Sequence, residues 1–120
     1  MGNVFLFWLI AEVPEKPVGP LLIDNITQNS VDLSWQPPKS DGGAPVKSYL
    51  IEYKPLDGRT WLKAGSTTGL VTDFTVPNLN EGTDYLFRVS AINEEGQGKP
   101  LESDTAVKPK KGISMYQFNN

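Results

Sequence analysis

Short runs of alternating apolar and polar residues cover most of this chain, and no segment shows sustained helical periodicity. An alternation with a period of two is typical of a strand that buries one of its faces. The dipeptide Asp57-Gly58 is typical of a hairpin turn. The pattern predicts seven strands, at residues 21–26, 31–36, 49–54, 60–65, 73–76, 84–93 and 102–108.

Seven short strands separated by turns predict an all-β fold, a seven-stranded sandwich of two antiparallel sheets. Isolated hairpins are unstable in water, so the inward faces of the two sheets must pack on each other. A buried tryptophan can also line a ligand pocket, but Trp35 has apolar neighbours at strand spacing, which favours a core position. The predicted core comprises Leu33, Trp35, Tyr49, Ile51, Leu79, Tyr85, Phe87 and Val89.

The segment after Trp35 reads QPPKSDGGAP and is either a binding loop, such as a phosphate cradle, or a connection between the sheets. Pro37 and Pro38 end the strand, because proline cannot donate a hydrogen bond to a ladder. The pair Gly42-Gly43 is too short for a phosphate site, and no helix is predicted after it. We therefore interpret the segment as a connection that crosses from one sheet to the other.

Composition narrows the class of protein and excludes several kinds of site. The chain has 120 residues, 38% hydrophobic and 21% charged, with 11 glycines and 10 prolines, as expected for one globular domain rich in turns. It contains no cysteine and no histidine, which excludes disulfides, thiolate metal sites and the commonest general base. A net charge of -3 argues against a nucleic-acid partner, whose binding depends on lysine and arginine.

The carboxylates do not form a recognisable catalytic pair. Asp41, Glu81, Glu94 and Glu95 all lie in turn-like segments, where solvated charge is the ordinary interpretation. No segment has a glycine-rich phosphate loop after a strand or the catalytic-loop pattern of a kinase. The sequence thus predicts that this chain is not an enzyme and binds no cofactor, metal ion or small-molecule ligand.

The two ends of the chain differ from the segment between them. An apolar run at residues 4–11 is too short to span a bilayer as a helix, which takes about 20 residues. The run has the length of a signal-peptide core, but it lacks a positive start, and Leu9 breaks the small-x-small cleavage pattern. We expect an apolar leader at residues 1–12, a folded domain at 13–110 and a tail at 111–120, with no insertion into a membrane.

Four segments of the chain resemble a known family. They are VPEKPVGP at 13–20, SVDLSWQPP at 30–38, DGGAPVKSYLIEY at 41–53 and TVPNLNEGTDYLFRVSAINEEGQGKP at 75–100. Together they closely resemble a fibronectin type III domain, with its immunoglobulin-like sandwich, over residues 13–110. The loop motifs W-x-P-P-x-x-D-G-G and NEEGQGKP are similar to those of the titin, twitchin and myosin-binding-protein-C family of giant muscle proteins.

The resemblance implies roles for several residues. Leu79 and Tyr85 match the tyrosine corner, in which the tyrosine phenol bonds to the connection before its strand. Gly82, Gly96 and Gly98 are expected to adopt positive φ in turns. The resemblance also implies that the chain has no catalytic site and that its roles are spacing, elasticity and the docking of partner proteins.

Two interpretations of function follow from the resemblance. The first is a cytoplasmic module of a sarcomeric muscle protein, whose partners are adjacent immunoglobulin and fibronectin type III modules and thick-filament proteins. The alternative is an extracellular module of a cell-adhesion molecule or receptor, including receptor phosphatases. Asn25-Ile26-Thr27 is a formal N-glycosylation sequon and, with the apolar start, supports only the extracellular alternative.

One group of residues is a candidate surface for partner proteins. Trp61 precedes a polar strand, and Arg88 points outward if its two neighbours in the strand point inward. We expect Trp61 and Arg88 to stack as a cation-π pair near Lys54 and Glu52. The simpler interpretation is that these four residues stabilise an exposed sheet face, and the alternative is an aromatic anchor for a partner protein.

Replacing Trp35 with alanine tests the predicted core. We expect Trp35→Ala to lower the free energy of unfolding by about 3 to 5 kcal/mol, because the change leaves a cavity between the sheets. Such a loss is a large share of the stability of a small domain, and thermal or chemical denaturation measures it. A melting temperature within a few degrees of the wild type would show that Trp35 lies outside the core.

Overall fold

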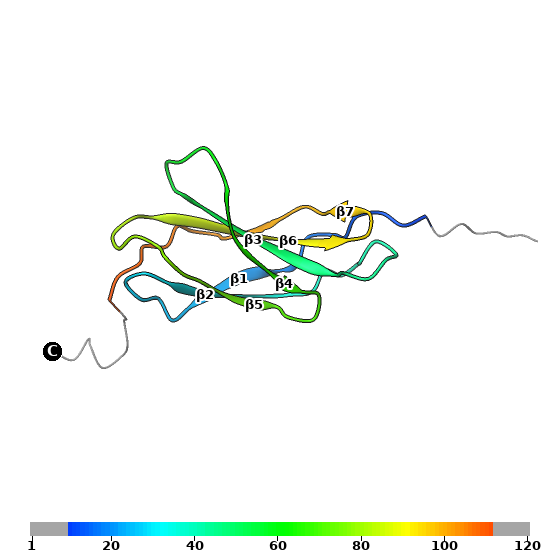
Figure 1. Ribbon diagram of the computed structural model, residues 1–120, viewed down its shortest axis with the longest axis horizontal. Coiled ribbons are helices and arrows are strands. Elements are labelled where there is room, and N and C mark those ends of the chain that lie inside the picture. Colours follow the sequence, from blue (N-terminus) through cyan, green and yellow to red (C-terminus); the bar gives the residue numbers. More distant parts are fainter. Residues whose placement is uncertain (1–9, 112–120) are drawn as a thin grey trace, which may run out of the picture.

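The computed structural model describes residues 10–111, which form two antiparallel sheets packed face to face (Figure 1). The first sheet has three strands, in the order β1 (Val18–Asp24), β2 (Val31–Gln36) and β5 (Asp73–Val76). The second has the order β4 (Leu62–Thr68), β3 (Ser48–Pro55), β6 (Tyr85–Asn93) and β7 (Gly96–Gln97), and β8 (Leu101–Glu102) also pairs with β6. The predicted all-β sandwich is confirmed, and residues 10–111 contain no helix.

The strand count is eight, not seven, because β7 is an additional short strand that precedes the last predicted one. The predicted last strand is itself reduced to β8 and a single bridge. β7 pairs with the end of β6, β8 pairs with its middle, and Val107 forms an isolated bridge to Tyr85. Pro100 has no backbone N–H, so the ladder cannot continue through it from β7 to β8. The prediction of one strand at 102–108 is therefore wrong, since the chain after β6 pairs with that strand only in separate short segments.

Two other strands are displaced from their predicted limits. β1 covers Val18–Asp24 rather than 21–26, because Asn25 has a φ of 48°, a left-handed conformation that ends an extended strand. β4 begins at Leu62 rather than residue 60, because the preceding loop starts with a turn in which Gly58 N–H donates to the Pro55 carbonyl at 2.8 Å. Strand ends depend on such local turns more than on the apolar pattern.

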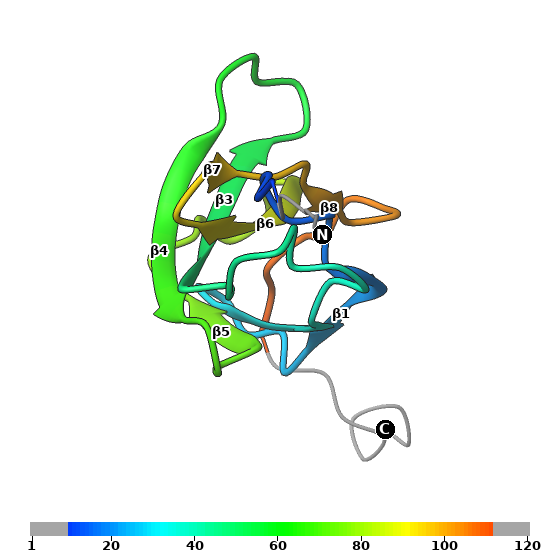
Figure 2. The same ribbon diagram turned by 90° about the vertical axis from the view of Figure 1, so that its right-hand side faces the viewer.

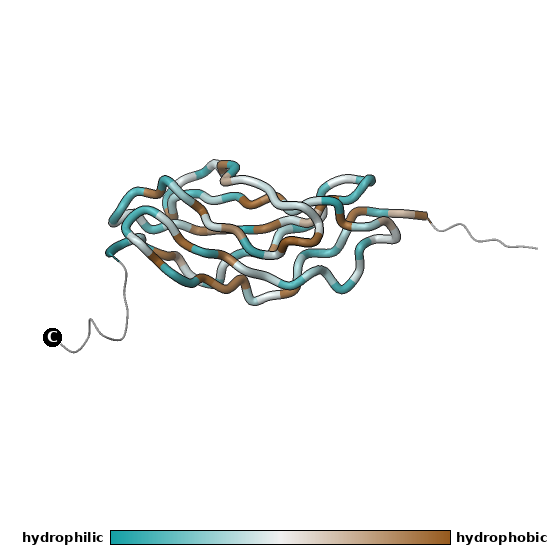
Figure 3. Tube along the Cα trace, turned by 60° about the horizontal axis from the view of Figure 1, so that its bottom comes forward, coloured by the Kyte–Doolittle hydropathy of each residue, from teal (hydrophilic) through white to brown (hydrophobic). Residues whose placement is uncertain are grey.

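Strand alternation places one face of each sheet in the core. Buried and less buried residues alternate along β2 and along much of β3 and β6, and hydrophobic and hydrophilic segments alternate along the trace in Figure 3. Trp35, 1% exposed, packs edge-on against Tyr49 of the opposite sheet, with ring centroids 5.4 Å apart at 64°. The buried cluster contains the eight residues predicted for the core together with Leu21, Val31, Val76, Ala91 and Val107.

Tyr85 joins the connection before β6 to the C-terminal end of the domain. Its hydroxyl accepts a hydrogen bond from the N–H of Asn80 at 2.9 Å, the bond that defines a tyrosine corner. Its backbone exchanges two hydrogen bonds with Val107, of 2.8 and 2.9 Å. Gly82, with a φ of 86°, donates to the carbonyl of Pro109 at 2.9 Å. These bonds attach the C-terminal segment to the core.

Asn93 is a buried polar residue at the opposite end of the sandwich, and no sequence pattern predicts its role. It is 1% exposed. Its side-chain amide donates to the carbonyls of Glu12 and Asp41, both at 2.7 Å, and its Oδ1 accepts from the N–H of Glu95 at 2.8 Å. One side chain therefore joins the N-terminal segment, the β2–β3 loop and the β6–β7 turn.

Gly98 lies beside the same N-terminal segment, and its predicted conformation is wrong. Gly96 has the expected positive φ, at 135°, but Gly98 does not. A Cβ atom at Gly98 would collide with the carbonyl oxygen of Pro14. Glycine is required there because two backbone segments approach closely, not because the turn needs a left-handed residue.

Replacing Asn93 tests the connection it makes. We expect Asn93→Ala to lower the free energy of unfolding by about 1 to 3 kcal/mol, because two carbonyl groups lose their buried donor. Chemical denaturation measures the change. The matched control is Asn80→Ala, an exposed asparagine whose backbone rather than side chain bonds to Tyr85. Equal stability losses in the two variants would contradict a special role for Asn93.

Candidate protein interaction surface

Four residues singled out from the sequence meet on the outer face of the five-stranded sheet. Glu52 of β3 and Arg88 of β6 are direct partners in the antiparallel register. Arg88 Nε lies 2.8 Å from Glu52 Oε1, and the two side chains are 24% and 15% exposed, respectively. Partial burial shields this ion pair from solvent screening. Trp61 and Lys54 complete the group, which we call the Trp61 cluster.

The indole ring of Trp61 lies against two cations. Arg88 Cζ is 4.3 Å and Lys54 Nζ is 5.4 Å from the ring centroid. Both distances fall within the roughly 6 Å range of cation-π interactions, each worth about 0.5 to 1 kcal/mol at exposed sites. Trp61 is only partly buried. The Trp61 cluster therefore stabilises the sheet face and still leaves part of an aromatic ring facing solvent.

Strand alternation and register position the side chains of this face. Arg88 points toward solvent because both of its neighbours in β6 are buried. The pairing of β3 with β4 shifts register after Ile51, so that Lys63 lies opposite Glu52. Lys63 is exposed and joins the same outward face. Alternation alone does not reveal this neighbour, because the bulge shifts every later residue of the strand by one position.

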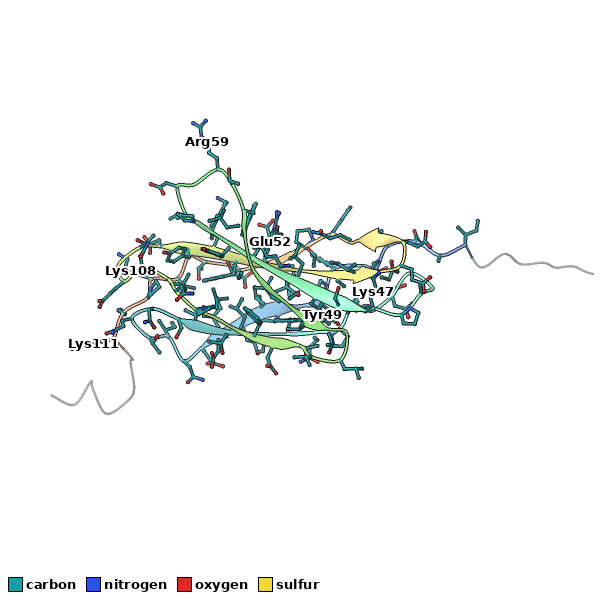
Figure 4. The ribbon with its side chains drawn as sticks, viewed as in Figure 1. Lys47, Tyr49, Glu52, Arg59, Lys108 and Lys111 are labelled. Carbon is teal, nitrogen blue, oxygen red and sulfur yellow. The ribbon has the colours of Figure 1, made fainter. Side chains whose placement is uncertain are left out.

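The β3–β4 loop, residues 56–61, ends at the Trp61 cluster. It stands clear of the sandwich in two perpendicular views (Figures 1 and 2), and Arg59 lies at its tip (Figure 4). Lys54 Nζ donates to the Gly58 carbonyl at 3.0 Å, and Gly58 N–H donates to the Pro55 carbonyl at 2.8 Å. These bonds and the stacked indole hold the base of a projecting loop that contains one acidic residue, Asp57, and one basic residue, Arg59.

The outer face of the three-stranded sheet is acidic. Its strands contain no lysine or arginine, and their charged residues are Asp24, Asp32 and Asp73. Thr75 Oγ1 donates to Asp32 Oδ1 at 2.6 Å, and Asn25 Nδ2 donates to Asp32 Oδ2 at 2.8 Å. These hydrogen bonds, that of Thr75 first, hold the pKa of Asp32 below its usual value, so its carboxylate stays ionised. A hollow of about 220 Å³ lies among these side chains.

The sequence of this chain is similar to those of a known protein family. The sequence model of the fibronectin type III domain matches residues 16–107. The chain belongs to the fibronectin type III family. It is 37% identical over 98 residues to the titin homolog of Caenorhabditis elegans. This match covers 82% of this chain and, to the nearest per cent, 0% of the titin homolog. It is 33% identical over 96 residues to the M-protein of striated muscle of Gallus gallus, covering 79% of this chain and 7% of that protein.

Solved structures agree with this assignment. A crystal structure of domains from titin superposes on this fibronectin type III domain with a TM-score of 0.77 and 35% identity, covering 84% of this chain and 34% of that one. Domains of this family are generally non-catalytic modules of titin-like proteins. The chain spans only a small part of the curated relatives it matches.

The β2–β3 loop of this fibronectin type III domain is a connection rather than a phosphate cradle. The N–H of Gly43 donates to Asp41 Oδ1 at 2.8 Å, and the N–H of Gly42 donates to Ser40 Oγ at 3.1 Å. The carbonyl of Gly42 accepts from the N–H of Glu12 at 2.8 Å. The amides that a phosphate would need are already bonded within the loop, which also holds the N-terminal segment.

Asn25 of the sequon is exposed, just beyond the end of β1. Its Nδ2, the atom that would carry a glycan, donates to Asp32, and the Thr27 hydroxyl lies 2.7 Å from the Ser30 hydroxyl. Attachment of a glycan would therefore have to rearrange the hydrogen bond to Asp32. Glycosylation stays a prediction.

Two other features, a metal site and a membrane-spanning helix, are absent from residues 10–111 of the fibronectin type III domain. Within residues 10–111, no group of three or more acidic, histidine or cysteine side chains has the arrangement of a metal site. Over the same range, no helix has the length and apolar character needed to cross a membrane. Residues 1–9 of the predicted leader and 112–120 of the predicted tail lie outside the described residues.

Proposed function

We propose that this fibronectin type III domain is a non-catalytic structural and protein-interaction module of a larger muscle protein in the cytoplasm of the sarcomere. Its roles are spacing, elasticity and docking to filament proteins. Its partners are adjacent immunoglobulin and fibronectin type III modules and thick-filament proteins. Similarity to a titin homolog and to the M-protein of striated muscle supports this proposal, as does the small share of those proteins that the chain covers.

The placement of the two ends carries the proposal. The N-terminal segment (blue) and the C-terminal segment (orange) leave the sandwich at opposite ends of its long axis (Figure 1). A pull on the two ends of the chain therefore acts along the strands. Because the hydrogen bonds of an antiparallel ladder run perpendicular to the strands, such a pull loads many of them together. This geometry favours a module that transmits tension.

Hydrogen bonds also join each end to the sandwich. At the N-terminal end, the carbonyl of Glu12 accepts from the buried Asn93 side chain at 2.7 Å. At the C-terminal end, Val107 and Tyr85 exchange two backbone hydrogen bonds. Tension on either end therefore passes into β6, the strand that contains both Tyr85 and Asn93.

Single-molecule force spectroscopy on the chain, placed between two reference domains, tests the mechanical role. Val107→Pro removes the N–H that donates to the Tyr85 carbonyl. Loss of this bond, worth roughly 1 to 1.5 kcal/mol, together with the changed packing of the buried Val107 side chain, should make unfolding at least about tenfold faster under the same force. Thr105→Pro is the control, since Thr105 is exposed and no backbone hydrogen bond joins its N–H to another strand within residues 10–111. A wild-type chain that extends without a discrete unfolding event would exclude a mechanical role.

The alternative, an extracellular module of a cell-adhesion molecule or receptor, is favoured by one observation. Asn25, the acceptor residue of the sequon, is exposed. We expect mass spectrometry of the parent protein from its own tissue to find Asn25 unmodified, because a cytoplasmic chain does not meet the glycosylation machinery. An N-linked glycan on Asn25 would replace the sarcomeric proposal with the extracellular one.

A further inference from the structure

The two outer faces of the sandwich differ in charge and in shape. The face of the three-stranded sheet carries the three aspartates and the hollow of about 220 Å³. On the opposite side of the sandwich, Arg59 stands at the tip of the projecting β3–β4 loop (Figure 4). Glu52 is already paired with Arg88, whereas no ion pair involves Arg59 or Lys63 within residues 10–111. One face is thus acidic and hollowed, and the other presents Arg59 on a projecting loop that also contains the acidic residue Asp57.

Contacts within the domain hold the base of the β3–β4 loop in place. Its base is fixed by Trp61, which stacks with Arg88, and by the hydrogen bond from Lys54 to the carbonyl of Gly58. A loop that is already ordered loses little conformational entropy on binding. The Trp61 cluster therefore anchors the base of the loop that presents the exposed Arg59, a role beyond local stability.

The acidic hollow suits a guanidinium group. Asp24 and Asp73 are exposed carboxylates on its rim, and no hydrogen bond to another side chain engages them within the described residues. Arginine forms paired hydrogen bonds with carboxylates more effectively than lysine does. Apolar surface lies near both features, since Leu62 beside the loop is 46% exposed and Leu22 of β1 is 51% exposed. A buried apolar contact with a charged rim is typical of protein interfaces.

We propose that a second copy of this domain docks on the first through these two surfaces. The β3–β4 loop of one copy lies on the outer face of the three-stranded sheet of the other, with Arg59 in the acidic hollow. The loop and the three-stranded sheet are on opposite sides of the sandwich (Figure 2). The contact is therefore heterologous, and each copy keeps one unused surface for a further copy. This inference deepens the docking part of the proposed function and does not rest on its mechanical part.

A contact built on one loop is weak between two single domains. Its strength multiplies when several modules of one protein meet several modules of a neighbouring molecule, because each later contact forms at a high effective concentration. Lateral association of parallel modular chains is the arrangement in which such a surface is useful.

Sedimentation velocity of the chain, from micromolar to millimolar concentration, tests the contact. At low salt we expect the average sedimentation coefficient to rise with concentration, and we expect this rise to shrink at high salt, which screens exposed charges. Arg59→Glu should abolish the rise, as should the double variant Asp24→Lys/Asp73→Lys. An equimolar mixture of these two variants should regain association, because the reversed loop then meets the reversed hollow.

Matched controls separate this contact from general electrostatics. Lys99→Glu changes the net charge by the same amount as Arg59→Glu, at an exposed position between β7 and β8, and should leave association unchanged. Leu22→Ser should weaken association, whereas Leu70→Ser, at a residue that is 95% exposed in the β4–β5 turn, should not. Thermal melts check that each variant is folded.

Three results would overturn the inference. They are a single monomeric species at every concentration in low salt, equal losses in Lys99→Glu and Arg59→Glu, and no recovery in the mixture of reversed variants. None of these results bears on the force experiment, which is done on single molecules.

Discussion

The edge-on packing of Trp35 against Tyr49 is the contact on which the rest of the structure depends. The chain has no cysteine, so no disulfide links the two sheets. Trp35 comes from the three-stranded sheet and Tyr49 from the five-stranded sheet, and both are almost fully buried. Apolar burial across this boundary, with the two rings at its centre, replaces the disulfide that other small sandwiches use.

The residues that β6 buries in the core also determine which of its residues lie on the outer face of the five-stranded sheet. Because Phe87 and Val89 are buried in the core, Arg88 between them points to the outer face, where register brings it to Glu52. A shift of one residue in β6 would bury Arg88 and expose its two apolar neighbours. Core packing therefore fixes the position of the Trp61 cluster, and this cluster in turn fixes the base of the β3–β4 loop.

Polar side chains complete the fold at its two ends, where apolar packing stops. Asn93 bonds to the N-terminal segment and to the β2–β3 loop, and Tyr85 bonds to the connection before β6. Both residues are buried and hydrogen-bonded, as a buried polar group must be if it is not to destabilise the fold. The two residues lie in the same strand, so the ends of the domain are coupled through β6 and not only through the core.

The sequence by itself determined six of the strands, the core and the nature of the β2–β3 loop, because period-two alternation, prolines and paired glycines act on neighbouring residues. It also predicted that Trp61 and Arg88 stack near Lys54 and Glu52, whereas the direct pairing of Glu52 with Arg88 came from the register of β3 and β6. Only the tertiary structure decided the short strands that follow β6, the close approach at Gly98 and the position of the acidic hollow, on the side opposite the loop that carries Arg59. Asn93 shows the reason most clearly, since its amide bonds to a carbonyl 81 positions earlier in the chain. Such contacts depend on how two sheets and their loops meet in space, and no local pattern records that.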